Sequence, residues 1–390
     1  MARLACRKKI RFWLIIVYCN YKGLFKALLK FHMKKTVLSL AALLLLAAAY
    51  MGFKPREAGA GISTVSTFGK QPAIAVDRNN TIKVVFGQGE EIFYTASRDG
   101  GQTFASPVRV ARQPKMALGM TRGPQITTTK DYTVIAAASF TGKIMAYRLK
   151  NGETQWSQPV NILQADTTAK EGFIALASGK GNVVYAAWLD MRQDHKNNIF
   201  SAVSPDGGRT WSAAKLVYAA PEGRVCPCCR PAITADQKGN VYVMFRNEWK
   251  GARDMYMARS RDGGKSFSPA QKLGMGTWNL KACPMDGGGI ALDARGQVGT
   301  TWRRENTIYY AGPGAMEQKI GEGRACSLAK TATGNYIVWQ QNSKILALSP
   351  GKLGPETLGE GSFPRIATLK DQSAISVWEA AGQIVARHLK

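Results

Sequence analysis

Short apolar segments separated by turn residues fill residues 61–390, and none has the 3.6-residue apolar period of an amphipathic helix. One kind of segment recurs and ends in, or beside, an aromatic residue. Its seven copies are IKVVF, VIAAASF, VVYAAW, VYVMF, VGTTW, YIVW and AISVW. Each copy has an apolar segment before it and another after it, with Gly, Asn and Asp between them. Short β-branched and aromatic runs bounded by turn residues predict strands, so we expect an all-β chain.

The repeating unit predicts a β-propeller. Three strands are clear in every copy, and a weaker fourth, such as PVRVA or KLVYA, follows in most of them. Four strands per unit at this period are typical of propeller blades. The last copy stops after its third strand at Lys390, and residues 61–68 precede the first copy, so this N-terminal strand is predicted to close the ring. We predict seven blades, with six as the alternative because the fifth and sixth copies are short.

One turn motif recurs between the third and fourth strands. It reads SRDGGQTF, SPDGGRTW and SRDGGKSF, with aspartates at Asp99, Asp206 and Asp262. The aspartate can accept backbone N–H groups across the turn, and the glycines permit positive φ. This motif resembles the Asp box of the bacterial neuraminidase repeat. The chain therefore resembles the sialidase-like β-propeller superfamily, which includes exo-α-sialidases. The resemblance implies that the three aspartates are structural and lie away from the active site.

The first 60 residues differ from the rest. After Met33, two lysines and the run TVLSLAALLLLAAAYMGF have the pattern of a secretory signal peptide. We therefore interpret residues 1–60 as an over-long start followed by a signal peptide, with initiation at Met33, and residues 61–390 as one propeller domain. The expected location is periplasmic or secreted. An uncleaved segment, which has nearly the length of a membrane span, is the alternative and would be the chain's contact with a membrane.

The charge of the chain suggests its partner. Lys and Arg number 53 against 26 Asp and Glu, for a formal charge of +27. The basic residues of the predicted propeller are scattered, without the basic run or helix that indicates a nucleic-acid partner. A basic exported protein is suited to acidic sugars. We expect a monomer that binds an anionic glycan or glycoconjugate and no nucleic acid.

Propeller connectivity predicts which face is functional. Turns between second and third strands open on the same face as the blade-to-blade loops, opposite the Asp boxes. Carboxylates expected on this face are the catalytic candidates Asp190, Asp194, Glu248 and Glu305. The arginines expected to bind a substrate are Arg122, Arg192, Arg230, Arg246, Arg303, Arg304 and Arg365. Guanidinium groups suit a sugar carboxylate because they bind it through two parallel hydrogen bonds.

The resemblance to sialidases implies a glycoside hydrolase in which three arginines hold the carboxylate of the sugar. However, Gln71 stands where the family has an arginine at the start of the first blade. Whether the chain is an enzyme therefore stays open. The alternatives are a propeller that binds a glycan or protein without catalysis, and a periplasmic protein that binds copper or zinc.

The segment EGRVCPCCRPAI places three cysteines within four positions. Under the predicted fold, the blade-to-blade loops contain five cysteines near one central mouth: Cys226, Cys228, Cys229, Cys283 and Cys326. In an oxidising compartment disulfides are the favoured interpretation, and no cofactor is then expected. The alternative is a Cu or Zn site, because thiolates suit both metals. Its further candidate ligands are Met116, Met120, Met285 and His195.

Overall fold

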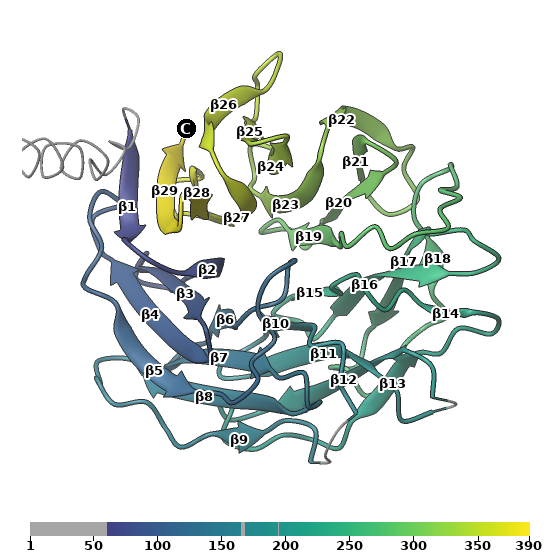
Figure 1. The fold of residues 1–390 in the computed structure, drawn as a ribbon, viewed down its shortest axis with the longest axis horizontal. Coiled ribbons are helices and arrows are strands. Elements are labelled where there is room, and N and C mark those ends of the chain that lie inside the picture. The colour runs from purple at the N-terminus through teal and green to yellow at the C-terminus, as the bar shows by residue number, and fades with distance from the viewer. Residues whose placement is uncertain (1–60, 165–167, 194) are drawn as a thin grey trace, which may run out of the picture. The chain divides into compact units, whose positions relative to one another are not determined.

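The computed structural model describes residues 61–164, 168–193 and 195–390. These residues form seven sheets in a ring around a central axis (Figure 1), and they contain strands but no helix. The predicted all-β propeller with seven blades is confirmed, and the six-bladed alternative is wrong. The predicted signal peptide, the start at Met33 and the candidate acid Asp194 lie outside the described residues. Within the described part of the chain, no helix has the length and apolar character needed to cross a membrane.

Five blades share one plan, in which four consecutive strands pair antiparallel from the axis outward. Blade 1 consists of β2 (Lys70–Val76), β3 (Ile82–Gln88), β4 (Glu91–Ser97) and β5 (Val108–Arg112). Blade 2 consists of β6 (Gln125–Thr128), β7 (Tyr132–Ala138), β8 (Ile144–Lys150) and β9 (Val160–Asn161). Blade 3 consists of β10 (Ile174–Ser178), β11 (Val184–Asp190), β12 (Asn198–Ser204) and β13 (Lys215–Tyr218). Blade 5 consists of β19 (Gly288–Leu292), β20 (Val298–Arg304), β21 (Thr307–Ala311) and β22 (Gln318–Glu322). Blade 6 consists of β23 (Arg324–Lys330), β24 (Asn335–Gln341), β25 (Lys344–Leu348) and β26 (Glu356–Glu360).

Blade 4 departs from this plan at its innermost strand. It consists of β14 (Arg224–Val225), β15 (Ala232–Ala235), β16 (Val241–Glu248), β17 (Met255–Ser260) and β18 (Gln271–Lys272). Both β14 and β15 pair with β16. Residues 226–231 leave the sheet between these two pieces, so a cysteine-bearing loop interrupts the inner strand.

The N-terminal strand completes the last blade. Blade 7 consists of β27 (Ser362–Thr368), β28 (Ala374–Ala380) and β29 (Gln383–Leu389), and β1 (Ile62–Ser66) pairs antiparallel with β29. The side chain of Val65 is 3% exposed and packs in one cluster with Phe86 of blade 1 and Ile384 of blade 7. The predicted closure of the ring by residues 61–68 is confirmed, and it covers an edge that would otherwise be free.

The second strand of each blade lies at the centre of the core. Every residue of β11 is buried, because neighbouring sheets cover both of its faces. The aromatic residues that mark the repeat include Trp188, Trp339 and Trp378, which are fully buried. Their indole N–H groups find acceptors: Trp339 donates to the carbonyl of Glu322 at 2.9 Å, and Trp378 to that of Glu360 at 3.0 Å. These tryptophans therefore pack blades together.

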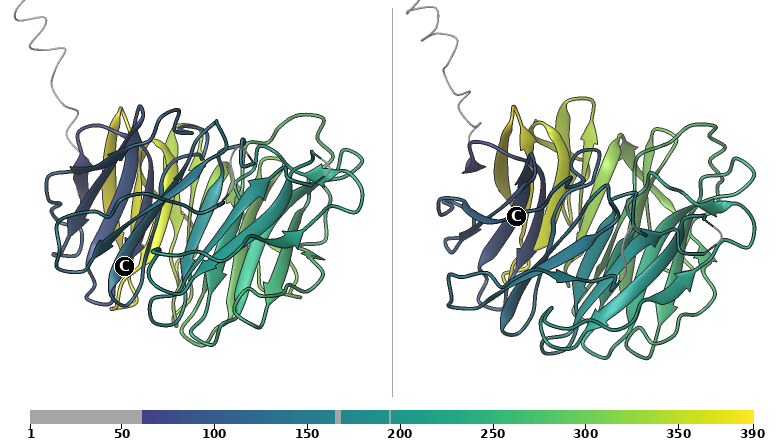
Figure 2. Two further views of the ribbon diagram at one scale, coloured as in Figure 1. Left: turned by 90° about the horizontal axis from the view of Figure 1, so that it is seen from below. Right: turned by 60° about the horizontal axis from the view of Figure 1, so that its bottom comes forward.

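The Asp boxes form turns held by their own side chains. The Asp206 carboxylate accepts the backbone N–H of Thr210 at 2.8 Å and its hydroxyl at 2.7 Å, and the Ser204 hydroxyl donates to it at 2.9 Å. Gly208 has φ 86°, which favours glycine. Asp99 and Asp262 form the corresponding bonds in their own turns. In the left view of Figure 2 the strands run between the two faces of the ring, and the loops lie at these faces.

Candidate functional site

The innermost strands of all seven blades line a channel along the ring axis. Residues from all seven of these strands or their flanks surround a cavity of about 180 Å³. Small and apolar residues from β2, β10, β19 and β23 form much of the wall, while Gln125, Arg230 and Arg365 add long polar side chains. Arg230 lies two residues before β15, and Arg365 lies within β27. The repeat thus brings two arginines, 135 positions apart in the printed sequence, to one cavity.

Arg230 and Arg365 hold positive charge where protein largely replaces water. Arg230 Nη1 donates to Gln125 Oε1 at 2.7 Å, and no carboxylate of the described residues forms an ion pair with either arginine. Burial lowers the pKa of Arg365 to about 10, although Asp286 partly offsets this effect. Burial and the charge of Arg365 both lower the pKa of Arg230. The two guanidinium groups are therefore partly desolvated without a full counter-charge.

Asp286 is the buried acid beside this cavity. Its side chain is nearly inaccessible, and burial raises its pKa. Its carboxylate accepts the Ala325 N–H at 3.0 Å, and Arg303 Nη1 lies 3.8 Å away. The charges of Arg303 and Arg324 also act on it, and Arg324 Nε is buried without a hydrogen-bond partner among the described residues. Arginine charge therefore exceeds carboxylate charge around the channel mouth.

Arg246, one of the arginines expected to bind substrate, supports the loops instead. It is 1% exposed, and its guanidinium donates to the carbonyls of Asp286 at 3.3 Å, Arg253 at 2.6 Å and Arg303 at 2.8 Å. It also lies 5.2 Å from the ring centroid of Trp278. These contacts tie blade 4 to blade 5, and they use the donors that a ligand would need.

Other predicted arginines are similarly engaged with protein groups. Arg122 donates to the Glu171 carbonyl at 2.8 Å and stacks on Phe173, with 4.3 Å to the ring centroid. Arg304 Nη1 donates to Glu317 at 2.8 Å. Arg192 pairs with Asp190, Nη2 to Oδ2, at 2.8 Å, and Arg303 donates to the Glu305 carbonyl. Arg230 and Arg365 are the two candidates that line the channel cavity.

The structure does not gather the candidate catalytic acids around these two arginines. Asp190 is fully buried, and its carboxylate accepts the Trp188 indole N–H at 2.8 Å as well as the Arg192 guanidinium. Glu248 pairs with Arg224 at 2.7 Å and with Arg253 at 3.2 Å. Glu305 is exposed on the turn between β20 and β21. Each described candidate acid thus lies in a different local environment.

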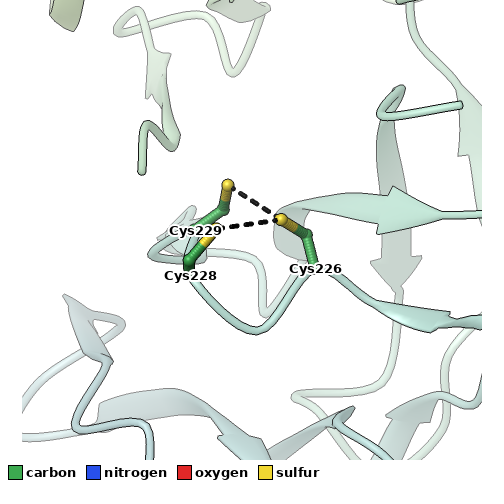
Figure 3. A group of neighbouring side chains, drawn as sticks. All are labelled: Cys226, Cys228 and Cys229. Carbon is green, nitrogen blue, oxygen red and sulfur yellow. Dashed lines mark hydrogen bonds between the residues drawn. The ribbon is translucent and has the colours of Figure 1, made fainter. Parts of the chain in front are cut away.

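The cysteine loop of blade 4 forms a compact thiol cluster (Figure 3). Cys226 Sγ lies 3.5 Å from Cys228 Sγ and 3.1 Å from Cys229 Sγ. All three residues are buried, and Met285 packs against them. Hydrogen bonds from the two neighbouring thiols, and the charge of Arg253, hold the pKa of Cys226 far below its usual range. The Arg253 guanidinium thus donates to the same sulfur atom that lies close to both other thiols.

The other two described cysteines stand outside this cluster. Cys283 is exposed. Cys326 is 3% exposed, and burial raises the pKa of its thiol to about 12. Each of the five described cysteines is a free thiol in this structure. The only described group of three or more Cys, His, Asp or Glu ligand atoms within 4.8 Å of one another consists of Cys226, Cys228 and Cys229.

Sequence reasoning missed several residues of this region. Gln125 contacts Arg230, and the charge of Asp286 acts on Arg365. Arg324 acts in turn on Asp286, and Arg253 donates to Cys226 Sγ at 3.2 Å. The loops that contain Asp286, Arg324 and Arg253 are placed on this face by the strand pattern. The partners of these residues, however, lie in other blades or across a turn, so no local sequence motif predicts the contacts.

A larger cavity, of about 690 Å³, opens where turns between first and second strands meet. Its charged groups are mostly satisfied by neighbours: Lys330 pairs with Asp293 at 3.3 Å, and Arg259 donates to Asn240 at 2.8 Å. Asp293 also accepts the backbone N–H of Gln297 at 2.8 Å to form its turn. This cavity is larger than the channel cavity, but the hydrogen bonds and ion pairs of its polar groups are used to stabilise the turns.

Comparison with known proteins supports the repeat. Residues 137–287 match the family model described as a BNR repeat-like domain. No curated protein matches the chain in sequence. Solved structures that are similar include a PL25 ulvan lyase, with 12% identity, 84% of this chain and 95% of the other covered, and a TM-score of 0.56. The BP39L lectin from Burkholderia pseudomallei has 11% identity, 84% and 98% coverage, and a TM-score of 0.54. A Hadza microbial sialidase has 13% identity, 84% and 66% coverage, and a TM-score of 0.50.

The class of protein follows from the ring of four-stranded blades, the Asp boxes and the matched repeat. The described residues form a seven-bladed β-propeller, and residues 137–287 of the chain match the BNR repeat-like domain. At these identities the solved structures show a shared fold, and function must be argued from the site.

Proposed function

We propose that this propeller binds the carboxylate group of an acidic sugar at its channel mouth, and that it acts as a binding module. The observation that carries the proposal is the pair Arg230 and Arg365, which line one cavity without a carboxylate partner among the described residues. Two desolvated like charges destabilise the unliganded protein. An anion placed between them would relieve this cost.

The size of the cavity limits what can enter it. At about 180 Å³ it is smaller than the roughly 300–1,000 Å³ of pockets that enclose whole small ligands. A cavity of this size can hold a carboxylate group, while the sugar ring would remain on the open face among the loops. Arg303, whose side chain is 20% exposed, stacks on the buried Trp278 with 5.2 Å from the guanidinium carbon to the ring centroid, and offers a polar group there.

Binding is favoured over hydrolysis because the described candidate acids are engaged away from the arginine pair. Asp190 is held by Arg192 and Trp188, and Glu248 by Arg224 and Arg253. Among proteins with a similar fold, the BP39L lectin and the ulvan lyase bound to -[GlcA(1-4)Rha3S]- both concern carbohydrates. An exported, monomeric protein that retains acidic glycans is part of the same proposal.

Isothermal titration calorimetry tests the proposal, with a glucuronate oligosaccharide and sialyllactose as ligands and lactose as the neutral control. Each charge-assisted hydrogen bond contributes about 1.5–3 kcal/mol, so Arg365→Met and Arg230→Met should each weaken binding by roughly 10- to 150-fold. The matched control is Arg109→Met, which removes an exposed arginine in β5. Affinity should fall as salt concentration rises.

Two results would overturn the proposal. The first is the absence of binding to both acidic sugars. The second is equal affinity in the wild type, Arg230→Met and Arg365→Met. Release of the reporter alcohol from an aryl sialoside by the wild type would replace the binding role with hydrolysis.

A further inference from the structure

The cysteine loop contains three potential metal ligands, all of which are thiols. The sulfur atoms of Cys226, Cys228 and Cys229 all lie within 4.8 Å of one another. The three residues are 0%, 6% and 1% exposed, respectively. In Figure 3 the Cys226 thiol faces the other two across the turn of the loop. One ion of ordinary size could contact all three sulfur atoms after shifts of a few tenths of an ångström.

The backbone holds this loop in place at several points. Both of its ends are anchored to β16, and the Cys226 N–H donates to the Arg246 carbonyl at 2.9 Å. On the far side, a Cβ at Gly287 would lie only 2.4 Å from the Arg230 carbonyl oxygen, so glycine allows the 285–288 segment to pack closely against the loop. Blades 4 and 5 therefore hold the sulfur atoms of the loop in place before a metal binds, which lowers the entropy cost of forming the metal site.

The surroundings of the cluster are positively charged. Arg253 Nη1 donates to Cys226 Sγ at 3.2 Å. The charge of Arg246 acts on Cys229, and that of Arg122 acts on Cys228. Three thiolates in a buried site need such compensation, because an unpaired buried charge is costly. Arg253 also pairs with Glu248 at 3.2 Å, which fixes the direction of its guanidinium.

We propose that Cys226, Cys228 and Cys229 bind one Cu(I) ion through three thiolates. Thiolate and thioether donors select Cu(I), and Met285 packs against the cluster as a neighbouring thioether. A structural zinc site needs four ligands, and no histidine or carboxylate joins the three sulfurs within the described group. Binding releases the thiol protons to solvent and leaves the oxidation state of copper unchanged. This site is distinct from the proposed sugar site and stands without it.

The test uses the full chain, reduced and kept under nitrogen, titrated with Cu(I) in competition with the chelator bicinchoninate. The wild type should take up one copper ion per chain, and X-ray absorption should show sulfur as the neighbour of copper. Cys226→Ser and Cys229→Ser should each lose this uptake. Cys326→Ser and Cys283→Ser, which remove thiols outside the cluster, should retain it. Arg253→Met should weaken the affinity by about 10- to 100-fold, as loss of a partner to a metal ligand typically does.

Several results would overturn the assignment. They are failure of the reduced wild type to take up copper, unchanged uptake by both Cys226→Ser and Cys229→Ser, and displacement of Cu(I) by Zn²⁺ when both are offered. Formation of a disulfide between Cys226 and Cys229 in place of copper uptake would do the same. Melting temperatures of the serine variants separate loss of the site from loss of the fold. The sulfur coordination of the wild-type copper complex is decisive even if a variant does not fold.

Discussion

Truncation of Val65 to alanine tests the closure of the ring by β1. Val65 is the buried residue with which β1 packs against both blade 7 and blade 1. Val65→Ala deletes two carbons, which corresponds to about 1.6 kcal/mol at roughly 0.8 kcal/mol per buried CH₂. A residual void of about 25 Å³ adds about 0.6 kcal/mol at 24 cal/mol per Å³. The expected loss in the free energy of unfolding is about 2 kcal/mol.

The corresponding change in melting temperature follows from the size of the domain. An unfolding entropy of about 2.1 cal/mol/K per residue over residues 61–390 gives about 0.7 kcal/mol/K. Val65→Ala should therefore lower the melting temperature by about 3 °C in differential scanning calorimetry. The matched control is Thr64→Ala, whose side chain is exposed on the same strand and should change stability by less than about 0.5 kcal/mol. Equal melting temperatures for Val65→Ala and the wild type would refute the argument that β1 closes the ring.

Two further predictions separate structural side chains from ligand-binding ones. In Asp206→Ala the turn loses its carboxylate acceptor, so the melting temperature at pH 7 should fall, with a loss of about 1–2 kcal/mol. Burial opposes the charged form of Asp206, but hydrogen bonds from Thr210 and Ser204 outweigh it and lower the pKa from 3.8. Its stabilisation is therefore present above about pH 4, and the difference between wild type and variant should shrink as pH falls below that; a constant difference would contradict it. Arg246→Met leaves three buried carbonyls without their donor, at about 1–3 kcal/mol each, and should lower the melting temperature markedly. Arg365→Met removes an unpaired desolvated charge and should leave the melting temperature unchanged or higher; a large decrease in it would show that Arg365 is structural instead.

The sequence determined the architecture because strand and turn signals are local. Alternation of apolar residues, the aromatic at the end of each second strand and the Asp boxes each occupy about ten residues, and their repetition defines the blades. The missing strand of the last unit and the spare strand at 61–68 were sufficient to predict closure by β1. The face that contains the cysteine loop also followed from connectivity.

Only the tertiary structure decided which charges are available to a ligand. The sequence does not distinguish Arg246 from Arg230. In the structure, Arg246 donates to the carbonyls of Asp286, Arg253 and Arg303, while Arg230 lines the channel and contacts Gln125 from another blade. For the cysteines, the closeness of Cys226, Cys228 and Cys229 follows from one short loop, but the tertiary structure decided that Cys283 and Cys326 stay outside the cluster. Burial, hydrogen-bond partners and counter-charges depend on groups brought together by the ring, and no local sequence pattern specifies them.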